Sequence, residues 1–163
     1  ILITTSEEML EKVQAEVDLQ LIKLTRKDIA AKSLENSKLI LVNNKEEAMD
    51  LSNAYAPEHL IIETLDYAEL SKNVINAGSV FLGSYTPESA GDYASGTNHT
   101  LPTHGYAMAY NGVNLDSYNR KVTFQEITPE GIRQIGNAVE IMAENEHLDA
   151  HKNAMKLRVD DVK

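Results

Sequence analysis

From Ile1 to Gly83, short apolar runs alternate with longer amphipathic intervals. The apolar runs predict strands at 1–4, 39–42, 59–64 and 79–83. The intervals predict helices, because apolar residues recur in them at steps of three or four. In the first interval these residues are Met9, Val13, Val17, Leu21 and Leu24. Strands that alternate with helices indicate an α/β fold with a mainly parallel sheet and crossover helices.

Polar residues at the boundaries of these intervals add local predictions. Thr5, with Glu8 three residues later, has the pattern of a capping box at the start of the first helix. A second helix is predicted at about 27–34, and Asp66 is a candidate N-cap for a later one. The run 39–42 is wholly apolar, which is typical of a strand that is covered on both faces.

Residues 90–106, AGDYASGTNHTLPTHGY, fit neither a helical nor a strand period. Gly, Ser, Thr, Asn and Pro clustered between periodic segments usually form a surface connection. A connection from about Ser84 to His104 is nevertheless long for a compact domain, and long loops are often either functional or disordered. Tyr85 and Tyr93 argue against disorder. The pattern alone leaves a plain connection and a functional loop as open alternatives.

After this loop the alternation ends, and residues 114–163 have a helical pattern. Thr128 is a predicted N-cap, and Pro129 follows it at the first helical position. An apolar stripe follows, and a last helix is predicted with Asp149 as its cap. These pieces make a poor independent core. We therefore predict two parts, an α/β part at 1–113 and a helical arm at 114–163 that packs on the α/β part or on a second subunit. The stripe consists of Ile132, Ile135, Val139 and Met142.

Composition and charge narrow the classes of function. With 163 residues, 42% hydrophobic and 25% charged, the chain has the composition of an ordinary globular domain. A formal net charge of −10 argues against a nucleic acid or an anionic membrane as partner. The absence of Cys excludes disulfides and thiolate chemistry and fits a cytoplasmic location. The chain begins without Met on a predicted strand, from which we expect a piece of a longer protein.

Several acids and histidines are candidates for chemistry. Glu58 and His59 stand where a predicted helix gives way to a strand, a position that is also compatible with a solvated strand entry. Position alone does not favour a site there, because sites in open α/β sheets usually lie beyond the carboxyl ends of strands. No spacing of a metal motif or of a nucleotide-binding loop is present. The other candidates are Asp92, His99, His104, Glu146, His147 and His151.

Five stretches resemble the C-terminal part of histidinol dehydrogenase in order and spacing: YAPEHLII, AGSVFLG, TPESAGDYASGTNHTLPT, VTFQEIT and AHKNAMKLRV. The resemblance runs from Ile1 to about Val159. It implies a partial α/β domain of aldehyde-dehydrogenase-like or Rossmann-like type with a helical C-terminal arm. It also implies the last two steps of histidine biosynthesis, in which L-histidinol is oxidised with zinc and two NAD to L-histidine through bound L-histidinal.

The resemblance implies a role for six of the candidate residues. His59 matches the catalytic base, which suits a neutral imidazole, and Glu58 matches the group that activates water. Asp92 and His151 match zinc ligands that also contact the substrate, and both side-chain types are normal zinc donors. The remaining matches are substrate contacts, at His99 and Glu146. His104 and His147 match no functional position.

The resemblance further implies that the family's nucleotide-binding domain and its other two zinc ligands precede the segment matched here. We therefore expect no cofactor-binding residue in this chain, an incomplete zinc site and no activity of the chain in isolation. In the family the arm crosses to the partner of a homodimer, so Glu146 and His151 complete the partner's site. The alternative is a non-catalytic α/β binding or assembly module derived from the same family. The presence of all six matched residues favours the enzyme.

Overall fold

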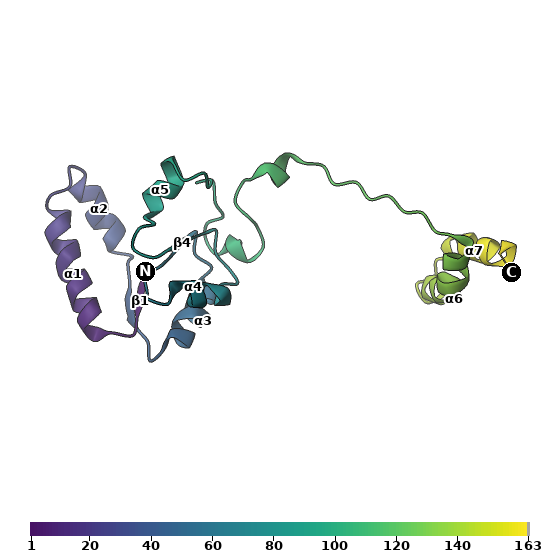
Figure 1. The fold of residues 1–163 in the computed structure, drawn as a ribbon, viewed down its shortest axis with the longest axis horizontal. Helices are drawn as coiled ribbons and strands as arrows, with labels where there is room; N and C mark the ends of the chain where they lie inside the picture. Colours follow the sequence, from purple (N-terminus) through teal and green to yellow (C-terminus); the bar gives the residue numbers. More distant parts are fainter. Residues whose placement is uncertain (163) are drawn as a thin grey trace. The chain divides into compact units, whose positions relative to one another are not determined.

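The computed structural model describes residues 1–162, and its chain divides into two compact units, Ile1–Asn119 and Arg120–Lys163. The first unit is an α/β body, and the second is a pair of helices (Figure 1). The strands of the first unit are β1 (Leu2–Thr4), β2 (Leu39–Leu41), β3 (His59–Ile62) and β4 (Ser79–Leu82). Its helices are α1 (Glu7–Leu21), α2 (Lys27–Leu34), α3 (Lys45–Tyr55), α4 (Tyr67–Leu70) and α5 (Glu88–Tyr93).

The strands pair in parallel, as the alternation of strands and helices predicts. β1 lies beside β2 with Leu2 opposite Leu39, and β3 lies beside β4 with His59 opposite Ser79. Helices α1 and α2 connect the first pair, and α4 connects the second. The predicted α/β fold with parallel strands is confirmed. Among the described residues, however, the four short strands form two separate two-stranded sheets and not one continuous sheet.

Three local predictions for the first unit are wrong. The N-cap of α1 is Ser6 and not Thr5, because the Ser6 hydroxyl accepts the hydrogen bond from the backbone N–H of Met9. Strand β2 is not covered on both faces, since Leu39 and Leu41 are 40% and 49% exposed. Residues 90–93 are helical and not part of a loop, because they complete α5.

The buried side chains of the first unit come from α3 and its C-cap, from β3 and from β4. They are Met49, Ser52, Ala56, Ile62 and Phe81. Asn53 fixes the end of α3 to the segment before β4. Its side-chain oxygen accepts from the backbone N–H of Ile75, its amide donates to the carbonyl of Asn73, and the Asn76 amide donates to its backbone carbonyl. The entry to β4 is therefore tied to the helix that leads into β3.

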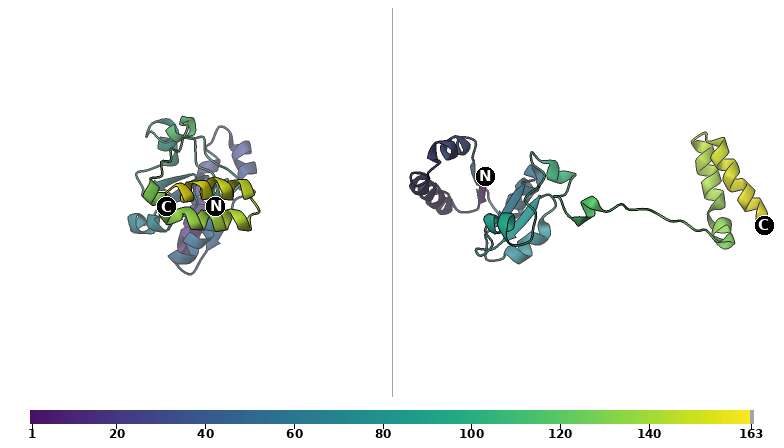
Figure 2. Two further views of the ribbon diagram at one scale, coloured as in Figure 1. Left: turned by 90° about the vertical axis from the view of Figure 1, so that its right-hand side faces the viewer. Right: turned by 90° about the horizontal axis from the view of Figure 1, so that it is seen from above.

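The second unit is an antiparallel helical hairpin of α6 (Pro129–Asn145) and α7 (Asp149–Asp161), and the two helices lie side by side (Figure 2). The predicted start of α6 is confirmed, because the Thr128 hydroxyl accepts from the backbone N–H of Gly131. Asp149 is not a cap: Leu148 holds the N-cap position of α7, and the chain turns at His147 with a φ of 59°. The Arg133 guanidinium closes the open end of the hairpin by donating to the carbonyl of Val162.

The apolar residues of α6 do not all face α7. Ile132, Gly136 and Ala143 are buried in the hairpin. In contrast, Ile135 and Met142 of the predicted stripe are 41% and 63% exposed. The helices approach closely at Gly136, because a Cβ at this position would overlap Cγ2 of Val159. The hairpin thus buries one narrow seam and leaves apolar side chains on its outside.

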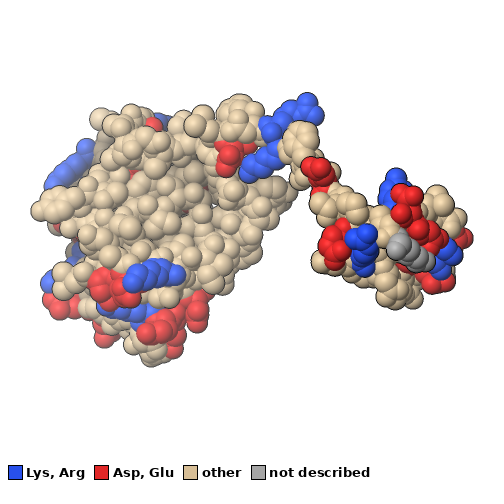
Figure 3. All heavy atoms as spheres, turned by 45° about the vertical axis from the view of Figure 1, so that its right-hand side comes forward, with Lys and Arg blue, Asp and Glu red and all other residues tan. Residues whose placement is uncertain are grey.

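Among residues 1–162, no helix has the length and apolar character needed to cross a membrane. On the face drawn in Figure 3, Lys and Arg atoms are scattered, and many lie beside Asp and Glu atoms. Much of this face of the first unit carries neither charge.

Candidate functional site

Three side chains that could act as bases or metal ligands meet in the first unit. His59, Glu88 and Asp92 each offer a nitrogen or oxygen atom, and these three atoms lie within 4.8 Å of one another. All three residues are partly buried, and the His59 side chain is 26% exposed. His59 and Asp92 are residues that the resemblance singles out, whereas Glu88 is not.

The backbone before β3 fixes the position of His59. Ala56, buried at the end of α3, has a left-handed backbone with φ 52° and turns the chain toward Pro57. The backbone N–H groups of Gly78 and Ser79 then donate to the carbonyls of Pro57 and Glu58, both at 2.9 Å. A Cβ at Gly78 would lie 2.5 Å from the Glu58 carbonyl oxygen, so this close approach requires glycine. These contacts hold His59 at the amino end of β3.

A tight turn after β4 directs α5 back toward His59. Gly83 has a left-handed backbone with φ 74°, and the Thr86 hydroxyl donates to the carbonyl of Leu82 at 2.7 Å. Helix α5 begins after Pro87, and its residues Glu88 and Asp92 share one face because they are four positions apart. The amino end of β3 is therefore completed by residues that follow the carboxyl end of β4.

Gly91 and Phe81 set how closely α5 lies on β4. A Cβ at Gly91 would come within 2.6 Å of Cε1 of Phe81. Phe81 is 4% exposed, and its ring centroid lies 5.9 Å from that of His59. The small residue on the helix thus allows both carboxylates to reach the imidazole, and the phenyl ring supports the imidazole from the sheet.

The imidazole of His59 has an unsatisfied nitrogen at the centre of this cluster. Nε2 is buried from solvent and has no hydrogen-bond partner among the described residues. It lies 3.6 Å from Oε1 of Glu88, which is within the range of an ion pair but too long for a hydrogen bond. A buried polar atom in such a position normally finds a partner on binding a ligand, a proton or a cation. The cluster is therefore suited to proton transfer and to metal binding.

His99 lies in the loop after α5 and lines a groove of about 1030 Å³. Thr97 and Asn98 beside it line the same groove, as does Ser79, the residue paired with His59 in the sheet. The loop is tied back to α5, because the Thr97 hydroxyl donates to the carbonyl of Gly91. The groove has room for a small molecule, and polar side chains lie beside apolar ones such as Leu101 and Leu115 in its lining.

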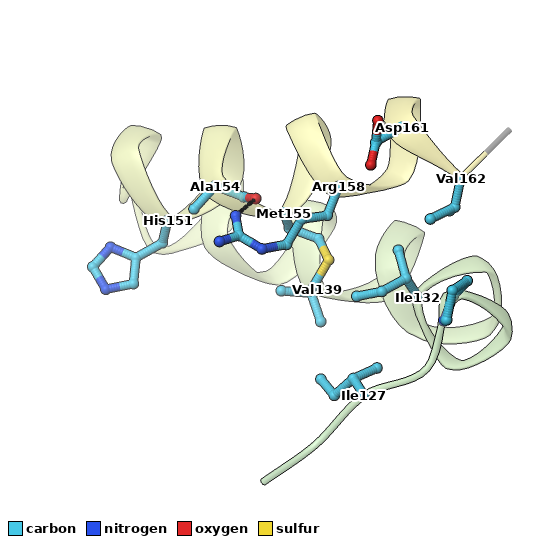
Figure 4. A pocket seen from close by; sticks show the side chains of 10 residues that line it. Ile127, Ile132, Val139, His151, Ala154, Met155, Arg158, Asp161 and Val162 are labelled. Carbon is cyan, nitrogen blue, oxygen red and sulfur yellow. Dashed lines mark hydrogen bonds between the residues drawn. The ribbon is translucent and has the colours of Figure 1, made fainter.

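The three-residue cluster does not include Glu58, Glu146 or His151. Glu58 directly precedes His59 and is partly buried. Glu146 is the C-cap of α6, and His151 is an exposed residue near the start of α7. His151 lies at one end of an apolar groove in the helical hairpin (Figure 4). The predicted break between the two helices is present, because α6 ends at Asn145 and α7 begins at Asp149.

Sequence reasoning missed Glu88, although a signal for it was present. Pro87 followed by Glu88 is a helix-start pattern, and Asp92 stands four residues further on. This spacing predicts two carboxylates on one helical face. The small residues of the segment 90–106 concealed this signal, because they favour a loop. The sequence does not show that Gly91 packs against the buried ring of Phe81.

Comparisons with known proteins all lead to one family. The family model described as histidinol dehydrogenase matches residues 1–159. A histidinol dehydrogenase of Bacteroides fragilis (strain YCH46) is 65% identical over 162 residues, which are 99% of this chain and 38% of that protein. A histidine biosynthesis trifunctional protein of Saccharomyces cerevisiae is 48% identical over 96% of this chain and 20% of its own length.

A solved structure supports the same relationship. The crystal structure of histidinol dehydrogenase from Elizabethkingia anophelis matches with a TM-score of 0.86 and 48% identity, over 98% of this chain and 37% of that one. The chain spans about 38% of the length of the curated Bacteroides histidinol dehydrogenases that it matches. On the match to the family model and these identities, the chain belongs to the histidinol dehydrogenase family.

Proposed function

We propose that this chain supplies catalytic and substrate-binding residues for the oxidation of L-histidinol to L-histidine through bound L-histidinal, with NAD as oxidant. The observation that carries the proposal is the meeting of His59 with Glu88 and Asp92 inside the segment that matches the family. An imidazole that can accept a proton is what the oxidation of an alcohol requires.

His59 is the proposed base in each oxidation. The O–H bond of the alcohol breaks and its proton goes to the imidazole, while a hydride leaves the same carbon for NAD. Glu58, one residue before His59, is proposed to take a proton from the water that adds to the aldehyde. The hydrated aldehyde is again an alcohol, so a second hydride and proton can leave in the same way. None of the residues in this chain is proposed to bind NAD.

Asp92 and His151 are proposed as zinc ligands that also contact the substrate, with His99 and Glu146 as further substrate contacts. The carboxylate of Asp92 is partly buried, and a carboxylate oxygen is a normal zinc donor. Bound zinc would hold the imidazole and amine of the substrate in position. The lining of the groove beside His99 supports a polar substrate there.

We further propose a cytoplasmic homodimer in which the helical arm is exchanged between subunits. The support is the arm's uncovered apolar surface. Ile127, Ile132, Val139 and Met155 line an open groove of about 640 Å³ on the hairpin (Figure 4). Leu157 is 70% exposed. Apolar surface of this kind normally marks an interface.

A chimeric enzyme tests the proposed activity. In the histidinol dehydrogenase of Bacteroides fragilis, the matching 162 residues are replaced by this chain. We expect the chimera to form two NADH for each L-histidinol, and the His59→Asn variant to lose at least about a hundredfold in rate. A folded chimera that binds L-histidinol but forms no NADH would support a non-catalytic binding module instead.

A further inference from the structure

We propose that Glu88 is a positioning residue for His59. It holds the imidazole in the tautomer with hydrogen on Nε2, so that Nδ1 remains free to accept the proton of the substrate. The catalytic part of this inference, that Nδ1 accepts the substrate proton, rests on the proposed function. The contact between the two side chains can be tested without activity.

The distance and the burial of one nitrogen carry the inference. Nε2 of His59 is buried without a partner, and Oε1 of Glu88 lies 3.6 Å away. A small side-chain rotation would bring these atoms to the roughly 2.9 Å of a hydrogen bond, and a buried polar atom gains by making one. A carboxylate can only accept, so the hydrogen must then reside on Nε2.

The surroundings limit the alternatives for the ring. Phe81, buried beneath the cluster, lies against the imidazole at 5.9 Å between ring centroids with a tilt of 39°. Asp92 is the other carboxylate of the cluster. If Asp92 binds the cation, as proposed above, its charge is engaged there. Glu88 is then the carboxylate left for His59.

The consequence for the reaction is a defined path for one proton. When Nδ1 takes the hydroxyl proton, the ring becomes an imidazolium with its second N–H directed at the Glu88 carboxylate. The charge that forms on the ring is then balanced at short range in a partly buried site, where such a pair is stronger than in water. The same logic applies wherever a carboxylate orients a histidine base.

The first test follows the tautomer of His59 in the 163-residue chain with ¹⁵N-labelled histidine. Long-range proton–nitrogen spectra distinguish Nδ1–H from Nε2–H, and the His59→Gln variant assigns the signals. We expect His59 to be mainly the Nε2–H form, and Glu88→Ala to convert it to a mixture of tautomers. Glu63→Ala removes an exposed carboxylate nearby in the sequence and should leave the spectrum unchanged.

Two outcomes of this test would overturn the proposal. One is a His59 spectrum that is the same with and without Glu88, in a variant whose other histidine signals show an intact fold. The other is stoichiometric zinc binding that removes the N–H signal of His59 Nε2 and shifts this nitrogen to the position of a metal-bound imidazole nitrogen. That result would make the three-residue cluster a metal site and His59 one of its ligands.

The second test uses the chimera described above. We expect Glu88→Gln to lower kcat about ten- to a hundredfold while KM for L-histidinol changes less than twofold, as for outer groups that orient a reacting side chain. Glu88→Asp should recover part of the loss. A raised KM with unchanged kcat would refute a positioning role. If the parent chimera is inactive, the proposed function fails, and the tautomer spectrum decides the contact by itself.

Discussion

At the scale of single residues, Gly91 decides whether α5 can carry its carboxylates to His59. We predict that Gly91→Ala destabilises the chain by about 1–3 kcal/mol, because the new methyl group would overlap the buried ring of Phe81. Alanine is the better helix former by about 1 kcal/mol, so the clash must exceed this gain. Urea unfolding measures the difference. Ser89→Ala, an exposed change on the same helix, is the control. Equal or greater stability of Gly91→Ala would show that the helix is not held against the ring.

The same residues show what a sequence can and cannot reveal. His59 and Asp92, which lie together in the structure, are singled out through their motifs, because long unusual stretches identify a family even when spacing alone says little. Glu88 is not found, since the helix that carries it is six residues long and is rich in small residues. Its proposed role depends on the position of Phe81, which a sequence shows only as one apolar residue of a strand. Tertiary packing overrides local propensity here.

At the scale of elements, the pairing of strands was predictable, and the extent of the sheets was not. Each apolar run predicts a strand, and the crossover helices require parallel neighbours. Whether β2 and β3 pair to form one sheet depends on side-chain packing, which the hydrophobic periodicity of the sequence does not show. The exposed Leu39 and Leu41 show the outcome, because a strand with a partner on only one edge leaves part of its apolar surface uncovered.

An ion pair that links two elements gives a prediction about pH. Lys45, the first residue of α3, donates from Nζ to both carboxylate oxygens of Asp66, the N-cap of α4. The pKa of Asp66 is lowered, mainly by this hydrogen bond from Lys45. Because the folded-state pKa lies below the unfolded one, the pair stabilises the fold above the ordinary pKa of Asp. This contribution is lost as pH falls through the lowered pKa.

We therefore expect the free energy of unfolding to fall on acidification below about pH 4, and to fall less steeply in Asp66→Asn. Urea unfolding over a series of acidic pH values at low salt measures both slopes. Glu47 also has a lowered pKa, mainly through the backbone N–H of Asn43, so part of the slope should remain in the variant. Identical slopes in the two proteins would mean that the pair contributes nothing, as for many exposed ion pairs.

The seam of the helical hairpin gives a second prediction at this scale. Gly136→Ala should separate α6 from α7, because the added methyl group overlaps Val159, whose branched side chain has few alternative rotamers. We expect hydrogen exchange of both helices in the full chain to accelerate about tenfold. Combining the change with Val159→Ala makes room and should restore slow exchange. Acceleration that persists in the double variant would place the cause outside this contact.

At the scale of the whole molecule, the sequence predicts the two parts but not their arrangement. The apolar stripe of α6 predicts that the arm needs a partner surface. Met142 and Leu157 remain exposed in the hairpin, so this apolar surface is not covered by the pairing of α6 with α7. We predict that the chain associates and that a chain ending at Asn119 does so at least about tenfold more weakly. Sedimentation over a range of concentrations measures this. Equal association of both chains would place the interface outside the arm.

Exchange of the arm can be separated from simple association by complementation. In the chimera, Asp92→Asn and His151→Asn should each be inactive if both side chains bind the metal. If an active site combines Asp92 of one subunit with His151 of the other, a mixed dimer of the two variants contains one site with both residues intact. Random mixing makes half of the dimers mixed, so an equal mixture that is unfolded and refolded together should regain about a quarter of the parent activity. A mixture of either variant with itself is the control and should stay inactive. If both residues act within one chain, the mixture gains nothing, and the arm serves its own subunit.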